Sequence, residues 1–328
     1  MIRVLFKNKQ DVFDTNLQIG DLVSALKDPE SLLWVDFTGE SIAQVETVFT
    51  DLFNFHPLAI DDALNEEHAP KINDWQEYLY IVLRGASYTS SESEQLIVPE
   101  LNIFLGSNYF VTYSQETSRN LDRVWDACQR DQRWIKRGTS HLLYWLADEL
   151  VGEAVGAVEN MQDELEQIED QLFAEAGPDT LERIFTLKQN VLHLRRIVIP
   201  QKEVLTKLAR NEYRVINTAD RIFFRDVYDH LLQLGNLLDD MIILVSSARV
   251  TYLSVVNNQM NDVVKTLTVI TAFFMPLAFI SGFFGMNFFQ ATMPFEPWTG
   301  TLAFVTTLAA MVLIPLLMFL WMRHKSWI

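Results

Sequence analysis

The chain of 328 residues combines a strong negative charge with an apolar composition. It carries 26 basic and 43 acidic side chains, a formal net charge of −17, yet 49% of its residues are hydrophobic. The charge balance excludes an electrostatic nucleic-acid binder, because such proteins neutralise phosphates with clustered basic side chains. One cysteine, Cys128, excludes a disulfide scaffold and a cysteine-based zinc site.

The charge is unevenly distributed. Residues 265–328 contain three basic side chains and one acid, Glu296, a balance of +2. Residues 1–264 therefore contain 23 basic and 42 acidic side chains, a balance of −19. The sequence predicts an acidic body joined to an almost uncharged C-terminal segment of 64 residues. Residues 1–10 lack an apolar core, so no secretory signal is expected there.

The first 138 residues mix strand and helix patterns and predict an α+β domain with a mixed sheet. Short apolar or aromatic runs bounded by polar residues predict strands, and Gly106–Asn108 predicts a hairpin turn. No glycine-rich loop follows a strand, so we expect no nucleotide site and find no catalytic set. Cys128 falls in a helix expected over 125–134, which favours an inert thiol. The expected strands are 2–6, 32–37, 78–84, 100–105 and 109–113, and the expected helices are 41–53 and 57–64.

From residue 139 onward the chain is expected to be helical. An acidic helical pair over 139–210 is divided at Gly177-Pro178, with Asp179 as the expected cap of its second helix. Basic side chains of the second helix could pair with the first. Ten acids lie between Asp148 and Glu175. They form either a solvated face or a surface that concentrates cations.

A third helix is expected from about residue 219, within a stalk segment spanning 211–289. Eight apolar side chains follow spacings of three and four, which predicts a packing seam. The seam could pack against the two preceding helices, against other copies of the chain, or both. Its members are Leu231, Leu234, Leu238, Met241, Val245, Ala248, Tyr252 and Val255.

Two uncharged stretches predict membrane spans at about 266–286 and 301–322, since a span needs roughly 20 apolar residues. The outer loop, 285–300, carries only Glu296, whereas Lys265, Arg323 and Lys325 flank the hairpin. By the positive-inside rule, both termini, including the basic tail 323–328, are expected to be cytoplasmic. A two-span anchor for a soluble domain is the simplest interpretation of hydropathy alone.

One stripe of the first span is polar or small. Such a stripe could line a channel or mark close contact between helices, and the spacing does not separate the two. Its members are Asn261, Val264, Thr268, Thr271, Met275, Ala278 and Gly282.

Gly285-Met286-Asn287 follows this span, and here the chain resembles the CorA family of magnesium and cobalt channels. Three further segments support the resemblance, in family order over essentially the whole chain. They are HPLAIDDALN (His56–Asn65), RDVYDHLLQL (Arg225–Leu234) and MPLAFISGFFGMNF (Met275–Phe288), followed by the ending Lys325-Ser326-Trp327-Ile328.

The resemblance implies a funnel-shaped homopentamer in the inner or plasma membrane of a prokaryote. It implies that hydrated Mg²⁺, and also Co²⁺ or Ni²⁺, passes through the pore and that no prosthetic group is needed. Gly285, Met286 and Asn287 would form the selectivity filter. Leu267 and Met275 would be apolar constrictions on a pore line that also includes Asn261 and Gly282. Together with the stripe described above, the expected pore lining is Asn261, Val264, Leu267, Thr268, Thr271, Met275, Ala278 and Gly282.

The resemblance also implies regulation, by Mg²⁺ bound between subunits at Asp61, Asp62 and Asp226. Decoration of a helix surface is the alternative for Asp61 and Asp62. The chain departs from common family choices at Val264 and Ala278, at Phe289 where an acid is frequent, and in its short basic tail.

Three functions stay open at this point. They are a Mg²⁺ channel, a Zn²⁺ transporter of the same superfamily, which could be coupled to protons, and a membrane scaffold or sensor. The six histidines are scattered, so no dedicated zinc chelation is expected from their spacing.

Overall fold

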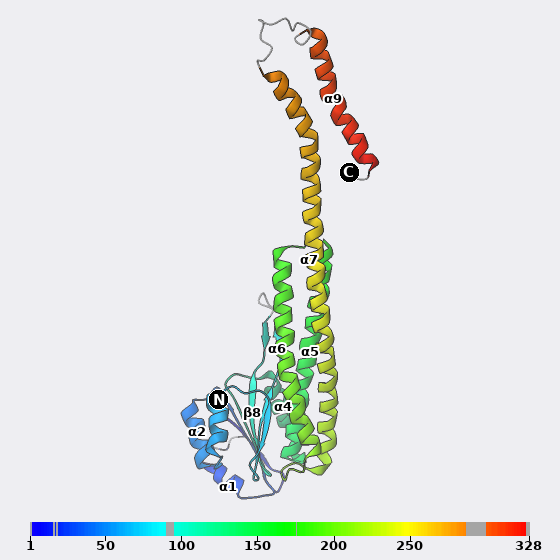
Figure 1. Ribbon diagram of the computed structural model, residues 1–328. Coiled ribbons are helices and arrows are strands. Elements are labelled where there is room, and N and C mark those ends of the chain that lie inside the picture. The colour runs from blue at the N-terminus through cyan, green and yellow to red at the C-terminus, as the bar shows by residue number, and fades with distance from the viewer. Residues whose placement is uncertain are drawn as a thin grey trace. The chain divides into compact units, whose positions relative to one another are not determined.

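The computed structural model describes residues 2–15, 17, 19–89, 95–174, 176–286 and 300–325. These divide into two compact units, Met1–Thr251 and Tyr252–Ile328. The first unit contains the sheet and most of the helices, and the second contains two apolar helical segments (Figure 1).

A mixed sheet forms the centre of the first unit. Within the described residues it has seven strands in the order β2-β1-β3-β9-β8-β5-β4. β3 and β9 are parallel, with Val35 opposite Val111, and the other neighbouring strands are antiparallel. β6 (Ser87–Thr89) and β7 (Gln95–Ile97) form a separate ladder. The strands of the main sheet are β1 (Ile2–Lys7), β2 (Phe13–Asp14), β3 (Leu32–Thr38), β4 (Lys71–Asp74), β5 (Leu79–Arg84), β8 (Glu100–Leu105) and β9 (Tyr109–Ser114).

Helices cover both faces of the sheet. α1 (Leu22–Leu26), α2 (Ile42–Asp51) and α3 (Pro57–Asn65) lie on one face. α4 (Arg119–Arg130) and α5 (Thr139–Ala174) pack on the other, followed by α6 (Pro178–Arg210). Short 3₁₀ turns occupy Ile19–Asp21, Ile135–Arg137 and Thr218–Asp220, the last leading directly into α7 (Arg221–Gly285).

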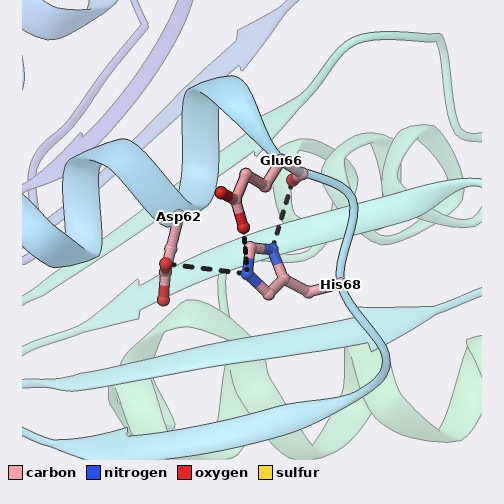
Figure 2. A group of neighbouring side chains, drawn as sticks. All are labelled: Asp62, Glu66 and His68. Atoms are coloured by element: carbon pink, nitrogen blue, oxygen red, sulfur yellow. Dashed lines mark hydrogen bonds and ion pairs between the residues drawn. The ribbon is translucent and has the colours of Figure 1, made fainter.

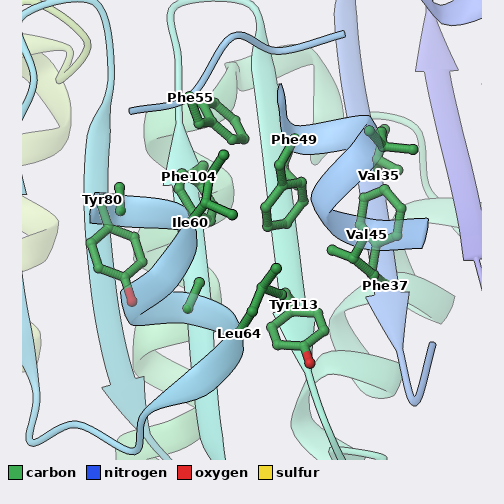
Figure 3. Close-up of a cluster of buried hydrophobic side chains, with 14 of the residues drawn as sticks. Val35, Phe37, Val45, Phe49, Phe55, Ile60, Leu64, Tyr80, Phe104 and Tyr113 are labelled. Atoms are coloured by element: carbon green, nitrogen blue, oxygen red, sulfur yellow. The ribbon is translucent and has the colours of Figure 1, made fainter. Parts of the chain in front are cut away.

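Aromatic side chains fill the layer between the sheet and α2–α3 (Figure 3). Phe49 of α2 meets Phe104 of β8 and Phe37 of β3 edge to face, with ring centroids 5.0 and 5.5 Å apart. On the opposite face Trp34 meets Trp125 of α4 at 4.7 Å. Cys128 of α4 is buried beside this layer, and burial raises the pKa of its thiol to about 12, as expected for an inert thiol.

The seam on α7 packs within its own chain. Seven of its eight side chains, Leu231 to Tyr252, are buried, and Val255 is half-buried. Asp239 pairs with Arg195 of α6 at 2.6 Å, and Phe224 contacts Tyr144 of α5 edge to face. The interpretation as packing against the two preceding helices is therefore confirmed for this part of the helix.

Two local predictions need correction. α6 begins at Pro178 and its cap is Gly177, because proline fits the first helical position without a backbone N–H; Asp179 is already inside the helix. α4 ends at Arg130, so Trp134 lies beyond the helix expected over 125–134. Arg183 faces α5 as expected and donates to Gln171 at 3.0 Å, whereas Arg195 pairs with α7 instead.

Arg3, near the start of the chain, forms ion pairs with Asp36 and Asp122. Asp36 of β3 is fully buried and accepts from Arg3 at 2.8 and 3.0 Å and from Thr112 at 2.7 Å. Burial raises the pKa of this carboxyl, and Arg3 opposes the rise. Arg3 also bonds Asp122 of α4 at 2.7 Å, so it ties β1, β3 and α4 together.

We predict that Arg3→Ala destabilises the protein by about 3 kcal/mol, because Asp36 would keep a buried charge without its cation. Lys9→Ala is the control, since Lys9 and its partner Glu30 are 60% and 61% exposed and such pairs contribute at most about 1 kcal/mol. Chemical denaturation measures both. Equal effects of the two substitutions would contradict the role of Arg3.

Candidate functional site

The second unit contains the C-terminal part of α7 and α9 (Thr301–His324). Both helices are long and apolar enough to cross a membrane. Phe273 of α7 contacts Phe319 of α9, with ring centroids 6.5 Å apart. Beyond residue 260, the half-buried side chains of α7 share the side of Phe273, and they are Val269, Ala272, Phe273, Pro276, Leu277 and Ile280.

The expected pore lining lies on a different face of α7. At 3.6 residues per turn its members fall within an arc of roughly 120°, turned away from the half-buried side. All eight are exposed in the single chain, including Leu267 at 62% and Met275 at 67%. The stripe is therefore not the contact between the two apolar helices of one chain.

Two threonines on this face keep acceptor oxygens available. Thr268 Oγ1 donates to the carbonyl of Val264 at 2.7 Å, and Thr271 Oγ1 donates to the carbonyl of Leu267 at 2.8 Å. Their hydroxyl hydrogens are used inside the helix, which leaves the oxygen lone pairs to accept hydrogen bonds. Rings of such oxygens suit the water shell of a cation.

α7 ends where the expected filter begins. Gly285 is its last residue, and the backbone N–H of Met286 bonds to the carbonyl of Phe283 at 3.4 Å. A methyl group added at Gly282 or Gly285 would meet no described atom of this chain within 4 Å. Asn287 and Glu296 lie outside the described residues.

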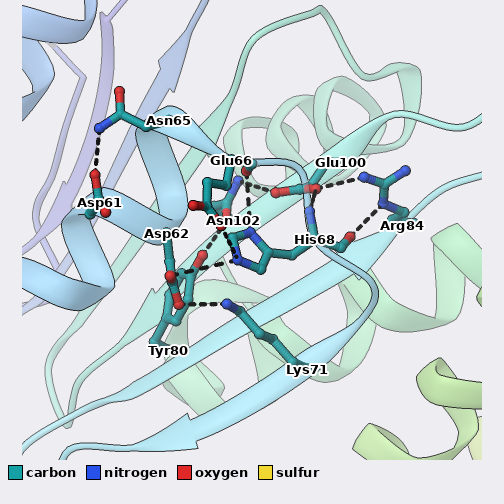
Figure 4. Close-up of polar contacts among 10 residues, drawn as sticks. All are labelled: Asp61, Asp62, Asn65, Glu66, His68, Lys71, Tyr80, Arg84, Glu100 and Asn102. Atoms are coloured by element: carbon teal, nitrogen blue, oxygen red, sulfur yellow. Dashed lines mark hydrogen bonds and ion pairs between the residues drawn. The ribbon is translucent and has the colours of Figure 1, made fainter.

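The expected regulatory carboxylates of α3 have partners within the chain (Figure 4). α3 starts at Pro57 behind His56, whose Nδ1 accepts from Leu58 N–H at 3.2 Å. One turn later, Asp61 accepts from Asn65 at 2.7 Å, and Asp62 Oδ2 lies 2.5 Å from Lys71 Nζ. Asp61 is exposed and Asp62 is half-buried, so both keep oxygens that can reach an ion.

Glu66 and His68 lie beside Asp62, and the spacing of the histidines did not predict this cluster. The ligand atoms of Asp62, Glu66 and His68 lie within 4.8 Å of one another (Figure 2). His68 Nε2 is 3.6 Å from Asp62 Oδ1 and 3.5 Å from Glu66 Oε2. The spacing of the histidines did not single out His68, and whether this group binds an ion stays a prediction. An acid pair four residues apart, with a histidine just beyond the helix end, was the available signal.

Asp226 lies in a different layer, exposed on α7 on the far side of the sheet from α3. Its neighbours are Asp148 of α5 and His230, whose Nδ1 is 3.9 Å from Asp148 Oδ1. Burial raises the pKa of Asp148, His230 opposes the rise and Asp226 adds to it. The chain therefore brings Asp226 to Asp148 and His230, but does not bring it to Asp61 or Asp62.

Comparison with known proteins decides the family. The family model for the CorA-like Mg²⁺ transporter protein matches residues 29–324. The chain belongs to the CorA-like Mg²⁺ transporter family. It is 31% identical over 307 residues to the cobalt/magnesium transport protein CorA of Thermotoga maritima, covering 93% of this chain and 86% of that protein.

Two further proteins match at lower identity. The chain is 25% identical over 281 residues to the zinc transport protein ZntB of Yersinia pseudotuberculosis, covering 83% of this chain and 81% of that protein. The complete structure of the CorA magnesium transporter from Methanocaldococcus jannaschii matches 99% of this chain and 98% of its own at 22% identity, with a TM-score of 0.80. The CorA fold, with a mixed sheet, a long helix and two apolar C-terminal helices, is therefore confirmed.

Membership of the CorA-like family establishes the general function. The chain is a divalent metal-ion transporter and not an enzyme. CorA-like proteins are membrane proteins with two apolar C-terminal helices, which correspond here to the end of α7 and α9.

The raised pKa of Asp148 has a consequence for stability. The folded protein holds this proton more tightly than the unfolded chain, so stability from Asp148 is present below about pH 3.9 and lost as pH rises through the folded pKa. We predict that Asp148→Asn is more stable than the parent at about pH 7 in chelator, and that the difference shrinks towards about pH 4. Thermal unfolding at both pH values measures this.

Asp163→Asn, an exposed position on the same helix, is the control for loss of charge alone. An advantage of Asp148→Asn that is equal at both pH values, or equal to that of Asp163→Asn, would contradict the assignment.

Proposed function

We propose that this chain forms a homopentameric channel that passes hydrated divalent cations, principally Mg²⁺ and also Co²⁺ and Ni²⁺. The observation that carries the proposal is the exposed stripe on α7, which the described residues of its own chain leave uncovered. Small and polar side chains within a span favour contact with other helices or with water over contact with lipid, so we expect other subunits or water against the stripe. A ring of five subunits, the assembly that the resemblance implies, supplies both.

The chemistry of the stripe suits hydrated Mg²⁺. This ion gives up its water reluctantly, so a pore selects it best by accepting hydrogen bonds from its water shell. Asn261, Thr268 and Thr271 offer neutral oxygens along the pore, and Asn287 would add a ring of amide oxygens at the outer end. Neutral acceptors avoid trapping the ion.

The closed state would depend on apolar constrictions and bound cations. Leu267 and Met275 would close the pore by excluding water. Mg²⁺ held between subunits by Asp61 or Asp62 of one and Asp226 of another would keep the assembly symmetric. The separation of α3 from Asp226 within one chain supports an inter-subunit site, and Asp148 would add charge beside Asp226.

We place the channel in the inner or plasma membrane of a prokaryote, with both termini in the cytoplasm. The basic side chains Lys265, Arg323 and Lys325 flank the two spans, which supports this orientation. The acidic body would then face the cytoplasm and attract cations to the inner mouth.

A Zn²⁺ transporter of the same superfamily, with or without coupling to protons, is the second candidate. The likeness to the zinc transport protein and the nitrogen donor of His68 favour it. Purified protein in liposomes separates the two, by measuring Mg²⁺ and Zn²⁺ uptake with and without a proton gradient. The Mg²⁺ channel predicts uptake driven by membrane potential alone; Zn²⁺ uptake without Mg²⁺ uptake would sink it.

The pore proposal predicts a difference between two similar threonines. Thr271→Val should lower Mg²⁺ flux several-fold, because it removes a ring of acceptor oxygens. Thr266→Val is the matched control, since Thr266 makes the same bond to the residue four before it but lies off the stripe. Asn287→Ala should abolish most flux. Unchanged flux in both Thr271→Val and Asn287→Ala would favour a scaffold or sensor.

The regulatory proposal predicts that Mg²⁺ stabilises the assembly. The thermal midpoint of the parent protein should rise by several degrees when Mg²⁺ replaces chelator. Asp226→Asn should lose most of that rise, whereas Asp229→Asn, exposed on the same helix, should keep it. A rise of equal size in all three proteins would show that Asp226 does not hold the regulatory ion.

A further inference from the structure

Asp62, Glu66 and His68, called here the α3 cluster, form a ligand set that shares Asp62 with the proposed carboxylate-based regulation and adds two donors, Glu66 and His68, which that regulation does not use. Asp62 and Glu66 lie one helical turn apart across the end of α3, and His68 comes two residues later. Seven consecutive residues, 62–68, therefore bring one imidazole and two carboxylates together. A single subunit supplies all three donors.

The backbone of His68 is held from both sides. Its N–H donates to Glu100 Oε2 at 2.7 Å, and its carbonyl accepts from Arg84 Nε at 2.8 Å. Arg84 and Glu100 themselves pair at 2.7 Å, and Asn102 donates to the other oxygen of Glu100 at 3.1 Å (Figure 4). The loop after α3 is thus fixed to β5 and β8, which preorganises the histidine.

The imidazole is also oriented. His68 Nδ1 lies 3.2 Å from the backbone carbonyl of Glu66, which can only accept, so Nδ1 carries a proton and Nε2 faces the carboxylates. Bonding of the second ring nitrogen to a carbonyl is the usual outer-sphere feature of histidine metal ligands. The position between Nε2 and the two carboxylates suits a cation, either a proton on Nε2 or a metal ion bound by a neutral imidazole.

The two distances from His68 Nε2 fit a small tetrahedral ion, and the three ligand atoms together lie within 4.8 Å of one another. Zn–N and Zn–O bonds of about 2.0–2.2 Å at tetrahedral angles place nitrogen and oxygen about 3.4 Å apart. The observed separations from Nε2 are 3.5 and 3.6 Å. Octahedral Mg²⁺, with bonds of about 2.0–2.1 Å, requires neighbouring ligands only about 2.9 Å apart and prefers oxygen donors.

Lys71 occupies one of the two carboxylate oxygens of Asp62. Its ammonium donates to Asp62 Oδ2, whereas His68 faces Asp62 Oδ1. Asp62 can therefore bind an ion through one oxygen, and the lysine neutralises the other. Exposure of Glu66 leaves the fourth position of a tetrahedron accessible to water.

We propose that the α3 cluster is an intra-subunit binding site for a borderline transition-metal ion such as Zn²⁺, Co²⁺ or Ni²⁺, with Asp62, Glu66 and His68 as ligands. The site shares Asp62 with the proposed inter-subunit carboxylates, but it differs from them because one chain completes it and because it offers nitrogen. It does not depend on the proposed channel, since binding is measured without ion flux.

The test is a Zn²⁺ titration of the full-length protein in detergent, with any polyhistidine tag removed and Mg²⁺ in excess to fill carboxylate sites. Calorimetry should find a Zn²⁺ site that survives the Mg²⁺ excess. His68→Ala should weaken it by at least about tenfold. His193→Ala, which removes an exposed imidazole on α6, should leave it unchanged.

A charge-matched pair of variants tests the carboxylate. Glu66→Gln should weaken Zn²⁺ binding, whereas Glu67→Gln, which removes the neighbouring charge that pairs with Arg84, should not. Co²⁺ gives an independent readout, because a tetrahedral site with an imidazole ligand absorbs visible light strongly, and this band should be missing in His68→Ala.

Three results would overturn the site. They are equal Zn²⁺ affinity in the parent and His68→Ala, equal losses in Glu66→Gln and Glu67→Gln, or displacement of Zn²⁺ by the Mg²⁺ excess. Binding in Lys71→Gln but not in the parent would also overturn it, because the lysine would then be the cation of the cluster.

Discussion

The two faces of the last part of α7 have different surroundings, and the proposed pore depends on that difference. One face, around Phe273 and Leu277, packs beside α9 within the chain. The other face, from Asn261 to Gly282, stays exposed and carries the polar and small side chains. A membrane does not tolerate uncovered polar side chains cheaply, so this face requires neighbours or water. The proposed ion path uses the second of these, water along the face.

The first unit has a different organising constraint, which is the need to hold acidic side chains without mutual repulsion. Asp36 is neutralised inside the fold by Arg3, and Asp62 is partly neutralised by Lys71. Asp148 and Asp226 remain close together, and His230 partly offsets their charge at Asp148. Bound divalent cations would relieve that repulsion, so the net charge of −17 is best understood together with the cations it attracts.

Sequence periodicity predicted the long elements well because their burial is regular. The seam from Leu231 to Tyr252 follows one face of a helix, and β3 and β8 are mainly apolar runs buried in a sheet. Short edge strands gave no such pattern. β4 (Lys71–Asp74) is half-exposed and polar, and β2 has two residues, so their pairing depends on neighbours distant in sequence.

The candidate sites show the same division. The stripe on α7 is a local helical pattern, so its eight members could be chosen from spacing and resemblance. The direction in which the stripe faces, away from α9, could not be predicted in this way, because it depends on how the two helices pack. His68 was not singled out because its position beside Asp62 and Glu66 arises from a turn after α3 that Arg84 and Glu100 hold from β5 and β8. The approach of Asp226 to Asp148 likewise depends on packing between α5 and α7.

Accessibility of single cysteines tests the central claim, that the exposed face of α7 lines the ion path. Cys128→Ser gives a cysteine-free background, since Cys128 is the one cysteine of the chain. Thr271→Cys and Phe273→Cys then place a thiol on the two opposite faces. A charged, water-soluble thiol reagent should block ion flux through Thr271→Cys and leave Phe273→Cys conducting. Block at Phe273→Cys with none at Thr271→Cys would contradict the account.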